Sequence, residues 1–300
     1  MSTPPPAEGL EIGLRALKLP SFLAYHAELA VRAEREGWSF SQYLYQLVQQ
    51  ELEDRARRRI ERRLKQSRLP LEKTLETLDK DRLPTPVRRQ LPVLCQGDFV
   101  DRADNLLVFG LPGRGKTHLV CAIAHQLILR GFRVLFTPTY SLVQKLLAAR
   151  RELTLEHILH KFDAFDAIVL DDIGYIQQDR DEMEVLFTFL SERYERKTVV
   201  ITSNLVFSQW DRIFKDPMTT AAAVDRLVHH ATIIELTGPS YRADAARTRN
   251  RVKPATNDNH PTTTTKPDDN PMTTTREEPA ENRQKQEDQA PQDQPGDGEK

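Results

Sequence analysis

The stretch GLPGRGKTHL, residues 110–119, decides the fold, because it combines three glycines with a lysine and a hydroxyl residue between two apolar runs. Residues 110–117 match the pattern GxxxxGK[ST], after the strand-like NLLVF and before the helix-like HLVCAIAHQLILR. Glycines let the backbone wrap an anion with its N–H groups, and a helix start adds the positive end of its dipole. We therefore predict a phosphate-binding loop; the alternative is a glycine turn without a ligand.

The loop pattern assigns roles to its last two residues and predicts ATP and Mg²⁺ as cofactors. Lys116 is expected to reach the β- and γ-phosphates of a nucleotide, and the Thr117 hydroxyl to ligate Mg²⁺. His118 is interpreted mainly as a local packing residue. The residues expected to hold ATP in this segment are Gly110, Leu111, Pro112, Gly113, Arg114, Gly115, Lys116, Thr117 and His118.

A phosphate loop also needs a carboxylate that orients the metal, and the segment AIVLDDIGY provides one. Asp171 ends an apolar run, so it should lie at the carboxyl edge of the sheet, where open α/β folds bind ligands. We predict that Asp171 contacts Mg²⁺, directly or through water, and that Asp172 orients the attacking water. The alternative for the double aspartate is a loop or a helix cap. Asn204, after the strand-like VVITS, is a candidate to place an amide beside the γ-phosphate.

Short apolar runs alternate with amphipathic ones between about residues 98 and 249. Five runs are strand-like: NLLVFG, RVLFT, AIVLD, VVITS and TIIEL. Helical patterns lie between them, at residues 116–130, 140–151 and 181–193. Strands buried on both faces and alternating with helices predict a parallel sheet in a layered α/β fold.

Composition divides the chain further. Residues 1–9 and 250–300 are expected to be disordered, 10–92 to form a helical domain and 93–249 the α/β domain. The last fifty residues hold seven Lys/Arg and eleven Asp/Glu, a net charge of −4, so the first 250 carry +3 of the total of −1. Such a polar, acidic tail cannot bury enough apolar surface to offset its ordering entropy.

The chain is expected to be cytoplasmic. Its two cysteines, Cys95 and Cys121, make no disulfide framework and fit a reducing compartment. No segment approaches 18 apolar residues, and the N-terminus lacks the pattern of a secretory signal. The pair His229-His230 lacks the i, i+4 spacing of metal ligands and a supporting acid, so no histidine metal site is expected.

The central region resembles the AAA+ ATPases of the IstB and DnaC type, over roughly residues 14–242. GLPGRGKTHL is similar to the Walker A segment, IVLDDIGY to Walker B, ITSNLVFSQW to the first sensor and DRLVHHATIIELTGPSYR to the end of the module. RRIERRLKQSRLPLEKTLETLD resembles the linker of IstB-type transposition helpers. The resemblance implies a P-loop AAA+ fold: a three-layer α/β/α parallel sheet preceded by a small helical domain.

In this family ATP sits between neighbouring subunits of a ring or spiral, so the resemblance implies a homo-oligomer. Arg226, in VDRLVHH, matches the arginine finger that reaches a neighbour's γ-phosphate, and Arg242, in PSYR, matches the second sensor. Without the resemblance, an ion pair with Asp225 would explain Arg226. The family usually has glutamate after the Walker B aspartate. Asp172 is one methylene shorter, which predicts slow or partner-dependent hydrolysis.

A basic cluster on one predicted helix indicates contact with the DNA backbone, without a base-reading motif. The alternative is a solvated face, or pairing with Glu51, Glu53 and Asp54. The cluster consists of Arg55, Arg57, Arg58, Arg59, Arg62, Arg63, Lys65 and Arg68.

The leading hypothesis is an ATP-hydrolysing helper of DNA transposition that oligomerises on duplex DNA and presents it to a cognate transposase. Predicted catalytic roles fall to Lys116, Asp171, Asp172, Asn204 and a neighbour's Arg226. A DnaC-like helicase loader, or an ATP-gated DNA clamp without appreciable hydrolysis, are the alternatives.

Overall fold

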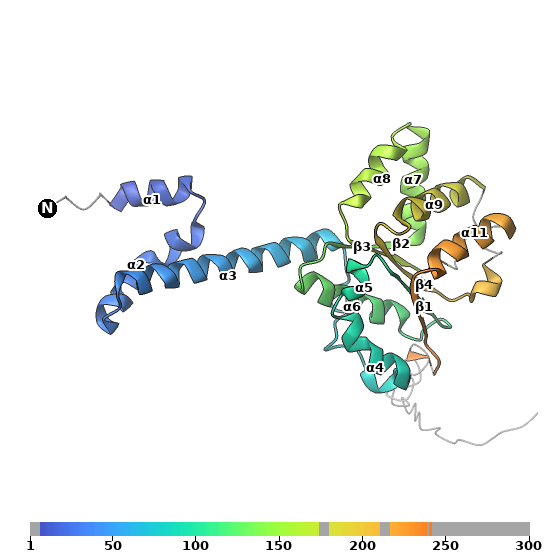
Figure 1. The fold of residues 1–300 in the computed structure, drawn as a ribbon, viewed down its shortest axis with the longest axis horizontal. Coiled ribbons are helices and arrows are strands. Elements are labelled where there is room, and N and C mark those ends of the chain that lie inside the picture. Colours follow the sequence, from blue (N-terminus) through green and yellow to red (C-terminus); the bar gives the residue numbers. More distant parts are fainter. Residues whose placement is uncertain (1–6, 174–179, 211–216, 239, 242–300) are drawn as a thin grey trace, which may run out of the picture. The chain divides into compact units, whose positions relative to one another are not determined.

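The computed structural model describes residues 7–173, 180–210, 217–238 and 240–241. Its centre is a five-stranded sheet in the order β2-β3-β4-β1-β5, in which every pair of neighbours is parallel (Figure 1). The strands are β1 (Asn105–Phe109), β2 (Val134–Pro138), β3 (Ala167–Asp171), β4 (Thr198–Ser203) and β5 (Ala231–Glu235). All five lie at the positions predicted from the apolar runs.

Helices cover both faces of the sheet, since alternate strand residues feed two separate apolar clusters. Leu106 and Val108 of β1 pack with α4, α5 and α6, whereas Leu107 and Phe109 pack with α7, α8, α9 and α11 (Figure 1). The first group is α4 (Thr85–Leu94), α5 (Asp98–Asp101) and α6 (Lys116–Leu129). The second is α7 (Thr139–Arg151), α8 (Leu155–Asp163), α9 (Arg180–Arg193) and α11 (Pro217–Val228). This confirms the predicted three-layer α/β/α fold of P-loop AAA+ proteins.

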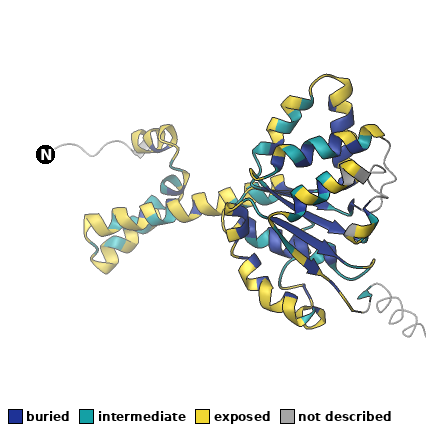
Figure 2. Cartoon of the chain, turned by 45° about the vertical axis from the view of Figure 1, so that its right-hand side comes forward, coloured by how far each residue is buried: buried dark blue, intermediate teal, exposed yellow. Residues whose placement is uncertain are grey.

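The described chain begins with three helices: α1 (Ala7–Ala16), α2 (Pro20–Glu36) and α3 (Phe40–Ser67). Ser39 caps α3 by accepting a hydrogen bond from the Gln42 N–H. Figure 2 shows α2 and α3 with mostly exposed residues, in contrast to the buried strands. Two carboxylates are nevertheless buried on α3. Glu51 and Asp54 accept hydrogen bonds from the N–H and the hydroxyl of Ser21 on α2, both at 2.8 Å, and so hold the two helices together.

The segment after α3 packs into the apolar core on the face of the sheet that α6 covers. Leu69, Leu78, Leu83 and Val87 share one apolar cluster with α6 and β1, and α3 itself contacts α6 and β2. The expected boundary at residues 92/93 therefore falls inside a continuous cluster, and the division into domains stays a prediction. Two 3₁₀ turns, η1 (Lys80–Arg82) and η3 (Phe207–Gln209), complete the elements.

Some predictions concern residues outside the described part of the chain. These are most of the N-terminal segment 1–9, the tail 250–300 and Arg242. Within the described part, none of the helices combines the length and the apolar character needed to span a bilayer.

Candidate nucleotide-binding site

The phosphate loop joins β1 to α6 and depends on glycine at its turns. Gly115, the residue before α6, has φ +85°, and Gly113 has φ +80°, a region that favours glycine. At Gly110 a Cβ atom would come within 2.7 Å of the Leu236 carbonyl oxygen. The glycines thus permit both the turn and the close contact with the chain after β5.

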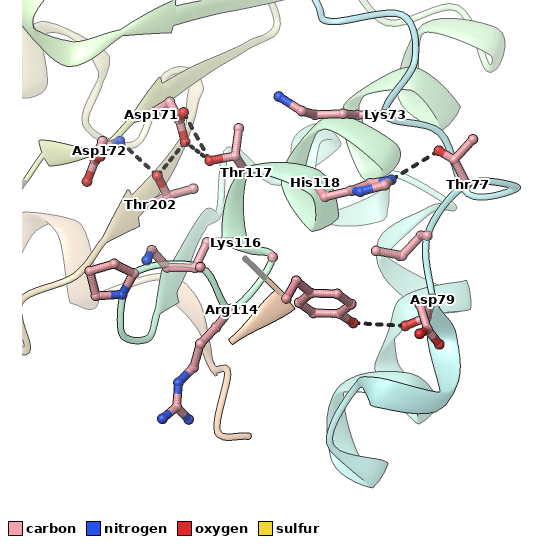
Figure 3. A pocket seen from close by; sticks show the side chains of 15 residues that line it. Lys73, Thr77, Asp79, Arg114, Lys116, Thr117, His118, Asp171, Asp172 and Thr202 are labelled. Atoms are coloured by element: carbon pink, nitrogen blue, oxygen red, sulfur yellow. Dashed lines mark hydrogen bonds between the residues drawn. The ribbon is translucent and has the colours of Figure 1, made fainter. Parts of the chain in front are cut away.

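A cavity of about 460 Å³ opens beside this loop (Figure 3). Four parts of the chain line it: the segment before η1, the loop with the start of α6, the ends of β3 and β4, and the chain after β5. The lining residues are Lys73, Thr77, Leu78, Asp79, Pro112, Gly113, Arg114, Gly115, Lys116, Thr117, His118, Asp171, Asp172, Thr202 and Tyr241. Gly110 and Leu111, also predicted to hold ATP, are outside this lining.

Lys116 points back into the loop from the first position of α6. Its Nζ donates to the carbonyl oxygens of Gly110 at 2.6 Å and Leu111 at 3.2 Å, and the residue is buried. A buried ammonium is stable only when its donors are satisfied. The loop carbonyls hold it beside the cavity, where a phosphate oxygen could take over one of these bonds.

The Asp171 carboxylate accepts hydrogen bonds from hydroxyl groups on two neighbouring segments. Thr117 Oγ1 donates to its carboxylate at 2.9 and 3.1 Å, and Thr202 Oγ1 donates to Oδ1 at 2.7 Å (Figure 3). The buried Thr139 fixes the backbone by donating to the Asp171 carbonyl oxygen at 3.0 Å. The predicted metal ligands, Thr117 and Asp171, are therefore in direct contact. A hydroxyl and a carboxylate are hard oxygen donors of the kind that Mg²⁺ prefers, so this pair fits the expected ion.

Asp172 lies beside this pair in a left-handed conformation, with φ +65°. Aspartate tolerates this region better than most residues, although at some cost. Its N–H donates to Thr202 Oγ1 at 2.8 Å, and its side chain lines the cavity. Thr202 therefore links the two aspartates, with a hydroxyl that donates to one and accepts from the other.

The structure places Thr202, not Asn204, in the cavity. Asn204 is outside the lining residues, and its Oδ1 is buried without a hydrogen-bond partner in the described part of the chain. Sequence reasoning missed Thr202 although a signal was present. β4 adjoins β3, and Thr202, polar and 1% exposed, interrupts an apolar strand near its carboxyl end.

His118 lines the cavity and also contacts the segment before η1. Its Nε2 lies 3.1 Å from Thr77 Oγ1 and 3.3 Å from the Thr74 carbonyl oxygen (Figure 3). Tyr241 also contacts this segment and the phosphate loop: it donates through its N–H to the Gly113 carbonyl oxygen at 2.9 Å and through its hydroxyl to the Asp79 carbonyl oxygen at 3.2 Å. Neither Tyr241 nor the 73–79 segment was among the predicted site residues.

Arg226 lies on α11 and is outside the cavity of its own chain. It donates to Ser191 Oγ, and its guanidinium lies 4.8 Å from the centre of the Phe187 ring. Both partners are on α9. Among the described residues no ion pair with Asp225 or another acid is present, so the proposed alternative for this arginine does not apply there.

The basic cluster on α3 is divided between two kinds of environment. Arg55 and Arg58 pair with Glu51 at 2.7 and 3.5 Å, and Arg57 pairs with Asp54 at 2.6 Å. The alternative of pairing within the helix therefore holds for these three.

The remaining basic residues of the cluster make no salt bridge within the described ranges. Arg63 lies against the turn after α6, since a Cβ on Gly131 would come within 3.2 Å of its Nη1. Arg59, Arg62, Lys65 and Arg68 are exposed. These four are the part of the predicted DNA-binding set that is open to a polyanion.

The histidine pair requires a correction, because an acid does lie beside it. Glu195 Oε1 is 3.7 Å from His229 Nδ1 and 3.7 Å from His230 Nε2. The three side chains form a candidate metal-binding group in which every member is exposed. The sequence does not reveal this acid, because the end of α9 and the start of β5 are adjacent in space but far apart in the chain.

Comparisons with known proteins identify the family of the chain. A model of the IstB-like ATP binding protein family matches residues 12–249. An insertion sequence ATP-binding protein from Sinorhizobium fredii is 47% identical over 249 residues, which cover 82% of this chain and 84% of the relative. The insertion sequence IS21 ATP-binding protein from Pseudomonas aeruginosa is 38% identical over 239 residues, covering 79% and 90%.

Among solved structures, the chain is similar to the crystal structure of DnaI, with 25% identity and a TM-score of 0.46, over 58% of this chain and 94% of that one. AMPPCP-bound DnaA from Aquifex aeolicus is 17% identical, with a TM-score of 0.48, over 61% and 56%. Because the family model spans most of the sequence and the relatives align along it, the chain belongs to the family of IstB-like ATP binding proteins.

Proposed function

We propose that this protein is a Mg²⁺-dependent ATPase that oligomerises on duplex DNA and presents that DNA to a transposase. The observation that carries the proposal is the contact between Thr117 and Asp171 in the cavity that the phosphate loop also lines. The names of the relatives, which refer to insertion sequences, favour transposition over the loading of a helicase.

In this proposal the phosphate loop holds the β- and γ-phosphates of ATP. The N–H groups at the start of α6 face the phosphates together with the positive end of the helix dipole. Lys116 exchanges a loop carbonyl for a phosphate oxygen. The hydroxyl of Thr117 and the carboxylate of Asp171 would hold Mg²⁺, which neutralises charge that develops on the phosphate oxygens.

Hydrolysis needs a group that orients water and a cation at the γ-phosphate. Asp172 is the candidate for the first, because it follows Asp171 and lines the same cavity. For the second we propose Arg226 of a neighbouring subunit, which would leave its contacts with α9 to enter that subunit's site. A cation supplied by a neighbour makes hydrolysis depend on assembly.

The test is release of phosphate from ATP, measured with and without duplex DNA. We expect DNA to stimulate turnover, and Lys116→Ala to lower it by about 10²- to 10³-fold, since a preorganised donor to the transferred phosphate is lost. Arg226→Ala should remove the DNA stimulation while leaving ATP binding intact. Lys161→Ala, an exposed lysine on α8, is the matched control. Full turnover by Lys116→Ala would refute the proposed site.

The short side chain of Asp172 supports a second candidate, a clamp that ATP gates without turnover. It would bind ATP and assemble on DNA but release no phosphate in repeated cycles. Asp172→Glu distinguishes the two. If the wild type is a clamp because its carboxylate is too short, the longer side chain should bring turnover. If the wild type already hydrolyses ATP, the substitution should change the rate little or lower it.

DNA contact is proposed for the exposed group Arg59, Arg62, Lys65 and Arg68. Each neutralised phosphate contributes about −0.9 to the slope of log K against log salt. Replacing all four with glutamine should therefore make the slope shallower by up to about 3.6. The matched control is Arg57→Gln, whose guanidinium is already paired with Asp54. An unchanged slope in the fourfold variant would contradict this assignment.

A further inference from the structure

The segment between α3 and η1, residues 68–79 and hereafter the linker, lies at the nucleotide cavity. Lys73, Thr77, Leu78 and Asp79 line the same cavity as the phosphate loop (Figure 3). Leu69 and Leu78 are buried in the apolar cluster of α6, so both ends of the linker are anchored. The part between these anchors passes along the cavity and leads directly to the basic helix α3.

Lys73 is the cation that the linker brings to this cavity. It is half-buried and makes no salt bridge with any described residue. Figure 3 shows its amino group directed from the linker toward the side where Thr117 and Asp171 lie. Asp171 is already occupied by the hydroxyls of Thr117 and Thr202. A partly desolvated ammonium without a carboxylate partner is a binding point for an anion.

The charge of Lys73 also acts on the Cys121 thiol, which lies one helical turn after Thr117. Burial raises the pKa of this thiol to about 12, and the positive charge of Lys73 opposes that rise, while the charges of Asp171 and Glu72 add to it.

A hydrogen-bonded turn fixes the backbone around Lys73. Thr77 Oγ1 donates to the Glu72 carbonyl oxygen at 2.7 Å and accepts from the Thr74 N–H at 3.0 Å. The same hydroxyl lies 3.1 Å from His118 Nε2, which also faces the Thr74 carbonyl oxygen. Because a carbonyl can only accept, His118 donates through Nε2 to this turn. The turn is thus attached to the residue that follows Thr117.

We propose that Lys73 binds the terminal phosphate of ATP, and that this contact holds the linker, and with it the base of α3, in a nucleotide-dependent position. The inference rests on the proposed ATP site and deepens it. A terminal phosphate is the ligand that the charge and location of Lys73 favour, since Thr117 and Asp171, the proposed metal ligands, line the same cavity. This contact should therefore strengthen the binding of ATP and change the binding of ADP little.

The test is equilibrium binding of a non-hydrolysable ATP analogue and of ADP to the full-length protein. Lys73→Gln should weaken the ATP analogue about tenfold, the effect of one hydrogen bond to a charged group, and ADP less than threefold. Lys73→Arg should retain most of the affinity. Lys80→Gln, an exposed lysine of η1 outside the cavity, is the matched control. Equal loss of ATP and ADP, or no loss, would overturn the inference.

Proteolysis gives a second measurement, independent of affinity. Glu72 and Glu76 are exposed, so a glutamate-specific protease should cut the linker of the free protein. At saturating ATP analogue we expect protection in the wild type and cleavage in Lys73→Gln. Cleavage at the same rate in both would contradict the role of the contact in holding the linker. Lys116→Ala distinguishes the failure of the ATP site from the failure of the Lys73 contact. Normal binding of the ATP analogue by Lys116→Ala would refute the site itself. Weakened binding by Lys116→Ala together with normal binding by Lys73→Gln would refute only the role of Lys73.

Discussion

The two ends of the parallel sheet both hold buried polar side chains, but they use them differently. At the amino end, Arg193 is 2% exposed and donates to the carbonyl oxygens of Phe162, Phe165 and Thr198, each at 3.1 Å. Asn105, also at that end, donates to the Leu227 carbonyl oxygen at 3.1 Å and accepts from the Val199 N–H at 3.0 Å. Backbone groups of the fold itself take up these hydrogen bonds.

At the carboxyl end the polar groups face a cavity and one another. Thr117 and Thr202 both donate to Asp171, and Asp172 occupies a left-handed conformation. These contacts join side chains, and a ligand can replace them without breaking the sheet. The polar groups at the amino end therefore contribute to stability, whereas those at the carboxyl end are positioned for binding, at some cost in strain.

The largest effect is expected at the amino end, from Arg193→Met. Methionine fills much of the volume but leaves three buried carbonyl oxygens without their donor, which should lower the free energy of unfolding by about 3 kcal/mol. Burial already lowers the pKa of Arg193 to about 10, so this guanidinium is retained against a desolvation penalty. Chemical denaturation measures the loss, and ATP affinity at low temperature should be unchanged. A loss below 0.5 kcal/mol would contradict the stabilising role of the polar groups at the amino end.

Thr202→Val should produce the next largest effect, and it should be functional. Valine keeps the shape but removes the hydroxyl that links Asp171 to the Asp172 N–H, so turnover should fall about 10- to 100-fold, as for other groups that orient metal ligands. Thr202→Ser, which restores the hydroxyl, is expected to recover most of the activity. Steady-state phosphate release measures both variants. If Ser and Val behave alike, the hydroxyl has no positioning role.

Asn105→Ala should lower stability by about 1–2 kcal/mol, because a buried carbonyl oxygen and a buried N–H lose their partners together. The side chain lies at the amino end of β1, so kcat and KM for ATP should stay within twofold of the wild type. Thermal unfolding and phosphate release on the same preparation check both parts. A selective fall in kcat would show that the two ends are coupled.

The smallest effect on stability should come from Asp172→Gly, and it has the opposite sign. Glycine adopts φ +65° without steric cost, so the variant should be more stable by about 0.5 kcal/mol. Hydrolysis should nevertheless be lost with the carboxylate. Asp172→Asn, which tolerates the same backbone conformation, is the control that removes only the charge. A destabilised glycine variant would mean that no strain is stored at this position.

Local patterns were sufficient to predict much of the fold and part of the site. The five strands, the phosphate loop and the pairing of Thr117 with Asp171 follow from signals that each lie within a few residues of the chain. Asn204 is the residue that the sequence predicts beside the γ-phosphate, but Thr202, two residues earlier, lines the cavity instead. Strand alternation would place both side chains on the same face, but β4 ends at Ser203, so the alternation does not extend to Asn204.

Other features depend on contacts between distant segments, which a single sequence does not contain. Lys73 reaches the cavity only because Leu69 and Leu78 anchor the linker under α6. Glu195 follows α9 and His229 precedes β5, yet their side chains lie 3.7 Å apart. The sequence indicates only as an alternative that some arginines of the basic cluster pair with acids of α3. Those acids, Glu51 and Asp54, also accept hydrogen bonds from Ser21, which lies about thirty residues away in sequence.

The strand order has a consequence for synthesis on the ribosome. β1, which carries the phosphate loop, and β3, which carries Asp171, are not neighbours, because β4 lies between them. β4 is made almost 90 residues after β1 and supplies Thr202 as the link. A nascent chain that ends before residue 198 therefore lacks the strand that joins the two halves of the site. Nucleotide should first stabilise the chain only after β4 has emerged from the exit tunnel, so nucleotide binding would report the point at which β4 joins β1 to β3.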